Sequence, residues 1–228
     1  MYLLVRSSCV VLFKAFTASL TLLAAPVSAT APFDVPIRPT ADFGALAVSA
    51  EARRVADWVV LSSDNNGLPF IIVDKVNATL FLFSTAGGIR AAVPALVGAD
   101  RGDDSVPGIG TRPLAAIRPA ERTTPAGRFV ARLGHDSSGA DILWVDYDDA
   151  IALHRVSDRK PGPSAQSRAQ RLHSTVAGDR RASLGCIGVS SGFYTGFVRP
   201  TFSAAGGIVY VLPETRTAAA EFHIDGGV

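Results

Sequence analysis

The chain has 228 residues, of which 48% are hydrophobic and 18% charged, and its formal net charge is +2. Arg6 and Lys14, near the N-terminus, supply that surplus, and the chain after residue 29 carries equal numbers of acidic and basic residues. It holds no basic run with interleaved aromatic residues, so the composition excludes a typical nucleic-acid-binding protein. The roughly 200 residues after the first segment are enough for one domain with its own core.

Residues 1–29 have the features of a secretory signal peptide. Two basic residues and an apolar run from Ala15 to Ala25 precede the small residues Val27-Ser28-Ala29, where a signal peptidase would cut. The alternative, an uncleaved anchor, is disfavoured because the apolar run is shorter than the about 20 residues that span a bilayer. We therefore expect cleavage near Ala29, a periplasmic or secreted protein, and no stable membrane insertion after cleavage.

Residues 30–66 are expected to form an N-terminal extension. A proline-rich extended segment opens it, and a helical pattern follows from about Ser49 to Leu61, with apolar residues on one face. The turn sequence Asp64-Asn65-Asn66-Gly67 ends the helix, because Asn and Gly tolerate left-handed backbone.

Residues 67–213 are expected to form one mainly β domain, a sandwich or barrel with few short helices. Residues 70–74 and 79–83 predict one hairpin, and residues 142–147 and 151–156 predict a second. Residues 91–97, 128–132 and 207–212 predict further strands, with Pro94 at an edge or bulge. Residues 98–122 and 157–182 are expected as long loops, the second with one helical turn, residues 191–198 as a short helix, and residues 214–228 as a tail.

Cys186 is the only cysteine outside the signal peptide, so it has no partner for an internal disulfide. A free cysteine is either an inert core residue or a reactive thiol, and the surrounding Ser183-Leu184-Gly185-Cys186-Ile187 favours the reactive role. A redox role is disfavoured because no second cysteine can resolve a mixed disulfide. The spacing of Cys, His and carboxylate residues predicts no metal site, and we expect no organic cofactor.

Four segments, in order, resemble the catalytic domain of the YkuD-type L,D-transpeptidases. They are Ser183-x-Gly185-Cys186-Ile187, Ile72-Val73-Asp74-Lys75 with Phe81-Leu82-Phe83, Thr124-Pro125-Ala126-Gly127-Arg128-Phe129, and Ile151-Ala152-Leu153-His154. The resemblance implies a YkuD-like β fold in which a cysteine attacks peptidoglycan tetrapeptide stems, releases D-Ala and passes the acyl group to an amine. It also implies inhibition by carbapenems. Leu184 and Gly188 stand where the family usually has His and Arg or Asn.

The chemistry of such a site needs a base beside the thiol and donors for an oxyanion. His154 ends an apolar strand and is the preferred general base and acid, with His173 in the polar loop as the alternative. The backbone amides of Gly185 and Cys186 are the expected oxyanion donors. The Ser183 hydroxyl is expected either to orient this segment or contact substrate, or only to stabilise the turn.

Arg155, Arg180 and Arg181 are expected to bind substrate carboxylates, because arginine pairs with carboxylates through two parallel hydrogen bonds. The alternative for each is a solvated basic loop. The expected partners are therefore peptidoglycan stem peptides. Two other functions remain open from the sequence: an L,D-carboxypeptidase or endopeptidase of the same fold, and a non-catalytic cell-wall-binding domain.

Overall fold

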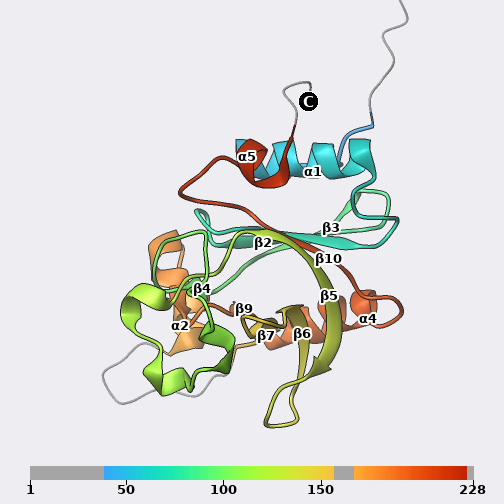
Figure 1. The fold of residues 1–228 in the computed structure, drawn as a ribbon. Coiled ribbons are helices and arrows are strands. Elements are labelled where there is room, and N and C mark those ends of the chain that lie inside the picture. The colour runs from blue at the N-terminus through green and yellow to red at the C-terminus, as the bar shows by residue number, and fades with distance from the viewer. Residues whose placement is uncertain (1–38, 157–166, 225–228) are drawn as a thin grey trace, which may run out of the picture. The chain divides into compact units, whose positions relative to one another are not determined.

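An eight-stranded sheet dominates the described part of the chain, residues 39–156 and 167–224 of the computed structural model (Figure 1). The strands lie in the order β3-β2-β1-β10-β5-β6-β7-β9, and β4 and β8 form a separate parallel pair. The predicted signal peptide, residues 1–29, lies outside the described residues, as do residues 157–166 of the polar loop. In the part that is described, none of the helices has both the length and the apolar character that a membrane crossing needs.

Both predicted hairpins are present, and the predicted strands are found within a few residues of their expected bounds. The strands are β1 (Phe70–Asp74), β2 (Thr79–Phe83), β3 (Ile89–Pro94), β4 (Val97–Gly98), β5 (Gly127–His135), β6 (Asp141–Asp146), β7 (Ile151–Arg155), β8 (Arg181–Ser183), β9 (Ile187–Val189) and β10 (Gly207–Val211). Pro94 ends β3, which is an edge strand, as expected for a residue without a backbone N–H.

The sheet curves until its two edges meet. The first half of β5 pairs with β10, the second half pairs with β6, and the strand arches between them (Figure 1). Beyond the edge strand β3, Leu96 forms a bridge with Gly188 of β9, the opposite edge, through two backbone hydrogen bonds of 2.7 and 2.9 Å. The mainly β, barrel-like fold with few short helices is therefore confirmed.

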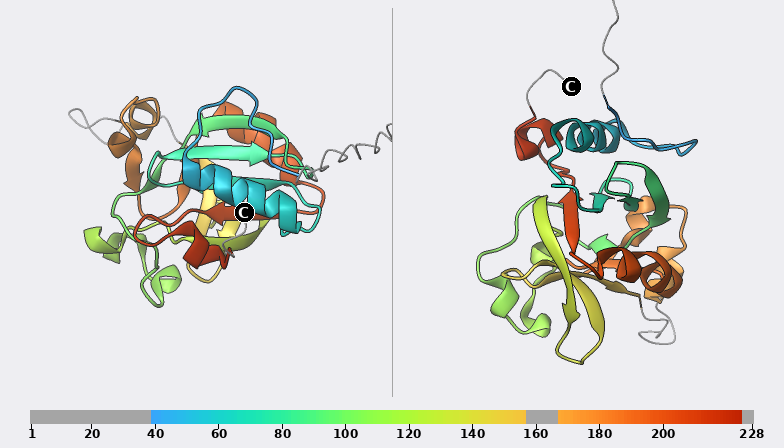
Figure 2. Two further views of the ribbon diagram at one scale, coloured as in Figure 1. Left: turned by 90° about the horizontal axis from the view of Figure 1, so that it is seen from above. Right: turned by 90° about the vertical axis from the view of Figure 1, so that its right-hand side faces the viewer.

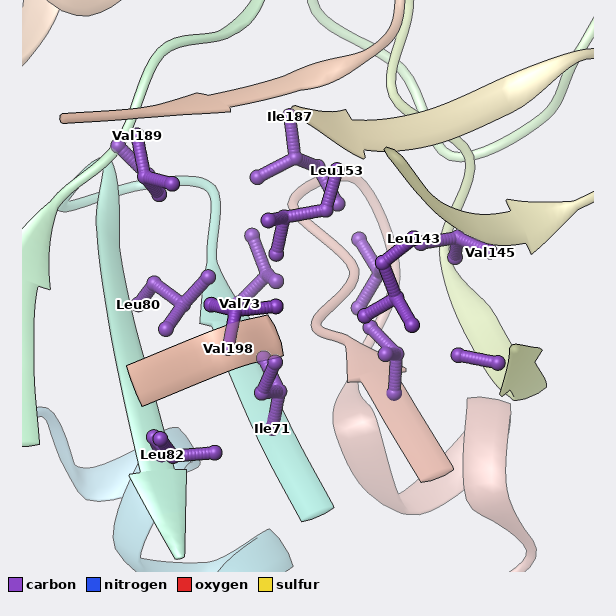
Figure 3. Packing of buried hydrophobic residues seen from close by; sticks show 14 of the residues in the cluster. Ile71, Val73, Leu80, Leu82, Leu143, Val145, Leu153, Ile187, Val189 and Val198 are labelled. Atoms are coloured by element: carbon purple, nitrogen blue, oxygen red, sulfur yellow. The ribbon is translucent and has the colours of Figure 1, made fainter. Parts of the chain in front are cut away.

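The main core lies between the two halves of the curved sheet (Figure 3). Ile71 and Leu80 from one half face Leu153 and Ile187 from the other, and all four side chains are fully buried. The same core also buries the residue two positions away on each strand, as the period of two requires for one buried face; these are Val73, Leu82, Ile151 and Val189. Each such side chain contributes about 1.5–3 kcal/mol when it leaves water.

A second core covers the outer face of β1, β2 and β10. Helix α1 (Ala50–Ser62) begins at Ser49, whose hydroxyl accepts from the Ala52 N–H, and it buries Ala52, Val55, Ala56 and Val59. Helix α5 (Ala218–Phe222) lies beside α1 (Figure 2), and Phe222 stacks on Trp58. The expected N-terminal helix is present. The residues expected as a tail instead carry α5, because Phe222 adds apolar surface to this core.

Short helices fill the connections. They are η1 (Ile109–Thr111), η2 (Leu114–Ala116), η3 (Pro119–Glu121), α2 (Arg168–Leu172), η4 (Ala177–Arg180), α3 (Ser191–Phe193), η5 (Tyr194–Val198) and α4 (Arg199–Phe202). The first three interrupt the expected loop of residues 98–122. The last three form one continuous run that extends the expected helix of residues 191–198 to Phe202 and buries Val198 and Phe202 in the main core.

Candidate active site

Cys186 lies directly before β9, in the short connection from β8 to β9. Strand β9 pairs in parallel with β7, with Leu153 opposite Ile187 and His154 opposite Gly188. The Cys186 side chain is partly buried, and Sγ donates to the carbonyl of Ala150 over 3.6 Å. Burial raises the pKa of the Cys186 thiol, so the resting thiol is protonated at neutral pH and needs a base before it can attack a carbonyl.

His154 lies near the thiol and is in a form that can accept a proton. His154 and Cys186 line the same hollow, together with Leu114 and Leu184. The Nδ1 atom of His154 lies 2.9 Å from the carbonyl oxygen of Arg155, so Nδ1 carries the proton and donates it. Nε2 is then left as the acceptor. Burial lowers the pKa of His154, which keeps the imidazole neutral and able to take a proton.

His173 lies elsewhere. It follows α2 as its C-terminal cap, it is exposed, and it lines neither of the hollows that contain Cys186. His135 and His223 are also exposed. Of the two histidines considered from the sequence, His154 is the one that shares a hollow with the cysteine.

A second hollow also borders the thiol. Its lining includes Ile109, Thr123 and Asp149, and it shares Leu114, Leu184 and Cys186 with the first hollow. Cys186 therefore lies at the boundary between two hollows.

The expected role of Arg155 in binding substrate is not supported by its contacts. Arg155 follows His154 on β7, so its side chain points to the other face of the sheet. Its guanidinium pairs with Asp141 and lies over the ring of Tyr194, with Cζ 5.0 Å from the ring centroid. Arg155 therefore makes structural contacts on the face of the sheet opposite the His154 imidazole.

Arg180 is buried and holds chain segments together. Its guanidinium donates to the carbonyls of Asn77, Ala78 and Ser174 over 2.6, 3.1 and 2.6 Å. These bonds tie the β1–β2 turn to the segment before η4. Arg180 lines neither hollow at Cys186, so its contacts do not support the expected role in substrate binding.

Arg181, like Arg180, is held by hydrogen bonds to backbone carbonyls. It donates to the carbonyls of Gly98 and Asp100 and pairs with the buried carboxylate of Glu214. Its guanidinium is fully engaged, and it lines neither hollow. These contacts do not support the expected role of Arg181 in substrate binding.

Arg168, which the sequence reasoning missed, is a cation that does line the hollow with Cys186 and His154. It is exposed and occupies the first turn of α2, where Ser167 and Gln170 form a capping box. Burial dominates the pKa shifts of Cys186 and His154, and the positive charge of Arg168 lowers both pKa values in addition. The capping pattern was the available signal, since it predicts a helix start inside the polar loop.

Position 185 requires glycine because of its backbone conformation and because neighbouring atoms lie close to it. Its φ is +138°, and a Cβ atom there would lie 2.8 Å from the carbonyl oxygen of Thr123. Its amide donates to the Ser183 hydroxyl over 3.1 Å. The Gly185 amide is therefore hydrogen-bonded within the turn, and this contact does not support the expected role as an oxyanion donor. Ser183 is buried and accepts this hydrogen bond.

Gly188 explains one departure from the family pattern. A Cβ atom at Gly188 would lie 2.8 Å from Val156 Cγ2 and 3.2 Å from Leu96 Cβ. The space beside β9 is thus filled by Leu96 and Val156, and an Arg or Asn side chain does not fit at this position.

Over residues 39–156 and 167–224, no three His, Cys, Asp or Glu side chains gather as metal ligands would.

No family model and no curated protein matches the sequence. Solved structures do resemble the chain at low identity. The helical cell shape determining protein Pgp2 from Campylobacter jejuni has a TM-score of 0.40 and 13% identity, over 66% of this chain and 48% of that one. The L,D-transpeptidase from Xylanimonas cellulosilytica has a TM-score of 0.37 and 18% identity, over 63% and 60%.

A third match, the L,D-transpeptidase from Mycobacterium smegmatis, has a TM-score of 0.32 and 16% identity, over 63% of this chain and 58% of that one. The chain thus spans between about half and three fifths of the length of these proteins. At such TM-scores the likeness says nothing about the reaction, which has to be inferred from the chain's own residues.

Proposed function

We propose that the protein is a cysteine-dependent L,D-transpeptidase that acts on peptidoglycan stem peptides outside the cytoplasmic membrane, after removal of residues 1–29. The observation that carries this proposal is the shared hollow of Cys186 and His154, which the parallel pairing of β7 and β9 brings together. A protonated thiol and a neutral imidazole are the two forms that general-base activation of a nucleophile needs.

In the first half of the reaction, Cys186 Sγ attacks the carbonyl carbon of the peptide bond between diaminopimelate and D-Ala in the donor stem. His154 Nε2 takes the thiol proton as the S–C bond forms. The carbonyl π electrons move to oxygen, and the Cys186 amide stabilises this oxyanion. His154 then gives the proton to the departing D-Ala nitrogen, the C–N bond breaks, and a thioester remains on Cys186.

In the second half, the amine of an acceptor stem attacks the thioester while His154 takes its proton. The C–S bond breaks and the thiolate recovers that proton. The second hollow at Cys186, which Ile109 and Thr123 also line, is the proposed place of approach for the acceptor. No organic cofactor or metal enters this scheme.

Arg168 is the proposed carboxylate-binding residue. Its side chain is exposed and lines the hollow that holds Cys186 and His154. Stem peptides carry free carboxylates, and a guanidinium binds a carboxylate through two parallel hydrogen bonds. Arg168 replaces the three arginines expected from the sequence in this role.

The test is the intact mass of the mature protein after incubation with a disaccharide-tetrapeptide or with a carbapenem. A gain in mass that is absent in Cys186→Ala supports the acyl-enzyme. Cross-linked products then identify a transpeptidase, whereas a free tripeptide stem identifies the carboxypeptidase alternative. No gain with either compound, at a thiol that still reacts with iodoacetamide, would contradict an acyl-enzyme and favour a wall-binding domain.

A further inference from the structure

The hydroxyl of Thr124 contacts the turn that carries the cysteine. Thr124 lies just before β5, and its side chain is buried. Its Oγ1 accepts from the Gly98 amide over 2.8 Å and donates to the Gly185 carbonyl over 2.7 Å. The hydroxyl has one proton. Because the Gly98 amide is itself a donor, the hydroxyl proton is donated to the Gly185 carbonyl oxygen.

The Gly185 carbonyl belongs to the same peptide unit as the Cys186 amide. A trans peptide is planar, with its N–H pointing opposite to its C=O. The hydrogen bond from Thr124 fixes the carbonyl direction, and it therefore also fixes the direction of the Cys186 N–H. Among the described residues no backbone carbonyl accepts from this N–H, whereas the neighbouring Gly185 N–H is taken by Ser183.

Thr124 is itself held by a buried charge. Lys75 Nζ donates to the Thr124 carbonyl over 2.9 Å and to Asp103 Oδ1 over 2.8 Å, and both ionised side chains are almost completely buried. Burial alone would raise the pKa of Asp103, but the hydrogen bonds from Lys75 and Thr215 hold that pKa well below its usual value. The carboxylate thus stays ionised, and Lys75 keeps a fixed place beneath Thr124.

We propose that Thr124 is a positioning residue for the oxyanion site: its hydroxyl holds the Gly185–Cys186 peptide so that the Cys186 N–H faces the developing oxyanion. Thr124 touches neither the thiol nor the substrate in this role. The inference rests on the proposed acyl-enzyme, because only attack on a carbonyl creates an oxyanion. Alkylation of the same thiol at a saturated carbon creates none.

That difference provides the test. Thr124→Val, which removes the hydroxyl at nearly constant shape, is compared with Thr124→Ser, which keeps it. Two reactions at Cys186 are followed in single turnover: acylation by p-nitrophenyl acetate and alkylation by iodoacetamide. Removing one oxyanion donor typically costs about 10²–10³ in rate. We expect Thr124→Val to lose about 100-fold in acylation and less than about 3-fold in alkylation, and Thr124→Ser to stay near the parent.

Thr79→Val makes the same chemical change on β2, where the hydroxyl donates only to the Asn77 carbonyl, and it serves as the matched control. Unchanged acylation in Thr124→Val, or an equal loss in both reactions, would overturn the proposal. Neither reagent is a stem peptide, so a failure of the proposed peptidoglycan reaction leaves this test intact.

The parent protein offers a second measurement that does not depend on any variant folding. Amide hydrogen exchange read by NMR should show a rapidly exchanging Cys186 N–H beside a protected Gly185 N–H. A strongly protected Cys186 amide would mean that the group is already hydrogen-bonded, and it would overturn the proposed donor. If Thr124→Val fails to give native circular dichroism, Thr124→Ala is compared with Thr124→Ser by the same ratio of acylation to alkylation.

Discussion

His154 lies directly opposite Gly188 in the parallel pairing of β7 and β9, and Gly188 is two residues beyond Cys186. This register brings the imidazole and the thiol into one hollow. The chain between the two strands can leave and return with any length, because the pairing of the strands sets the geometry. The long interval between His154 and Cys186 in the sequence is therefore compatible with a working pair.

The two histidines should differ sharply in mutational effect. His154→Ala removes the base and should slow acylation of Cys186 by about 10²–10⁴-fold. His173→Ala changes an exposed residue outside both hollows and should leave the rate within about 2-fold, as for most surface substitutions. Single-turnover acylation by p-nitrophenyl acetate measures both variants. The opposite ranking would make His173 the base.

The pH dependence of acylation should reflect a neutral resting pair. Burial lowers the pKa of His154 below its ordinary 6.5, so the rate should rise with pH and the midpoint of that rise should lie below 6.5. Burial raises the pKa of Cys186 above its ordinary 9.0, so a second rise from the free thiolate should come only above that value. Stopped-flow acylation across this range measures both steps. A single ionisation near about 4 would instead indicate a preformed thiolate–imidazolium pair.

Arg168 should affect substrate binding more than thiol chemistry. Arg168→Ala removes the guanidinium from the hollow and should raise KM for a tetrapeptide donor about 10-fold, or about 1.4 kcal/mol, with alkylation of Cys186 little changed. Arg168→Lys should recover part of the loss, since an ammonium cannot form the two parallel bonds. Arg54→Ala, at an exposed position on α1, is the matched control. An unchanged KM would exclude Arg168 from the donor site.

Gly188→Ala should destabilise the fold. The added methyl would press on Val156 and Leu96, and overpacking of this kind typically costs about 1–3 kcal/mol. Gly192→Ala provides the control, because no atom lies within 4 Å of a Cβ at that position of α3. Urea unfolding followed by circular dichroism measures both variants. Equal stability of the two would show that the β9 edge can open at little cost.

Arg180→Ala should likewise act on stability. It leaves the carbonyls of Asn77, Ala78 and Ser174 without their charged donor, and a lost hydrogen bond to a charged group costs about 1.5–3 kcal/mol. The midpoint of urea unfolding should fall, while KM of the folded protein stays the same. A raised KM at unchanged stability would return Arg180 to the substrate site.

The sequence alone determined the local elements and the two candidate residues for the proposed chemistry. Helix α1 follows from the periodic apolar residues and the Ser49 cap, and the β1–β2 hairpin follows from two apolar runs around a polar turn. These patterns are readable because period and capping depend on neighbours within a few residues. Cys186 and His154 could be chosen because one is the only cysteine after residue 29 and the other lies at the end of an apolar run.

Only the tertiary structure decided which charged and backbone groups remain available at the site. Arg180 and Arg181 donate their hydrogen bonds to carbonyls of segments that are distant in the sequence. Arg168 lines the hollow because it lies in the first turn of a short helix. The Gly185 amide is taken by Ser183, and the Gly185 carbonyl by Thr124. Hydrogen-bond partners of this kind are set by long-range packing, so no pattern of neighbouring residues in the sequence contains them.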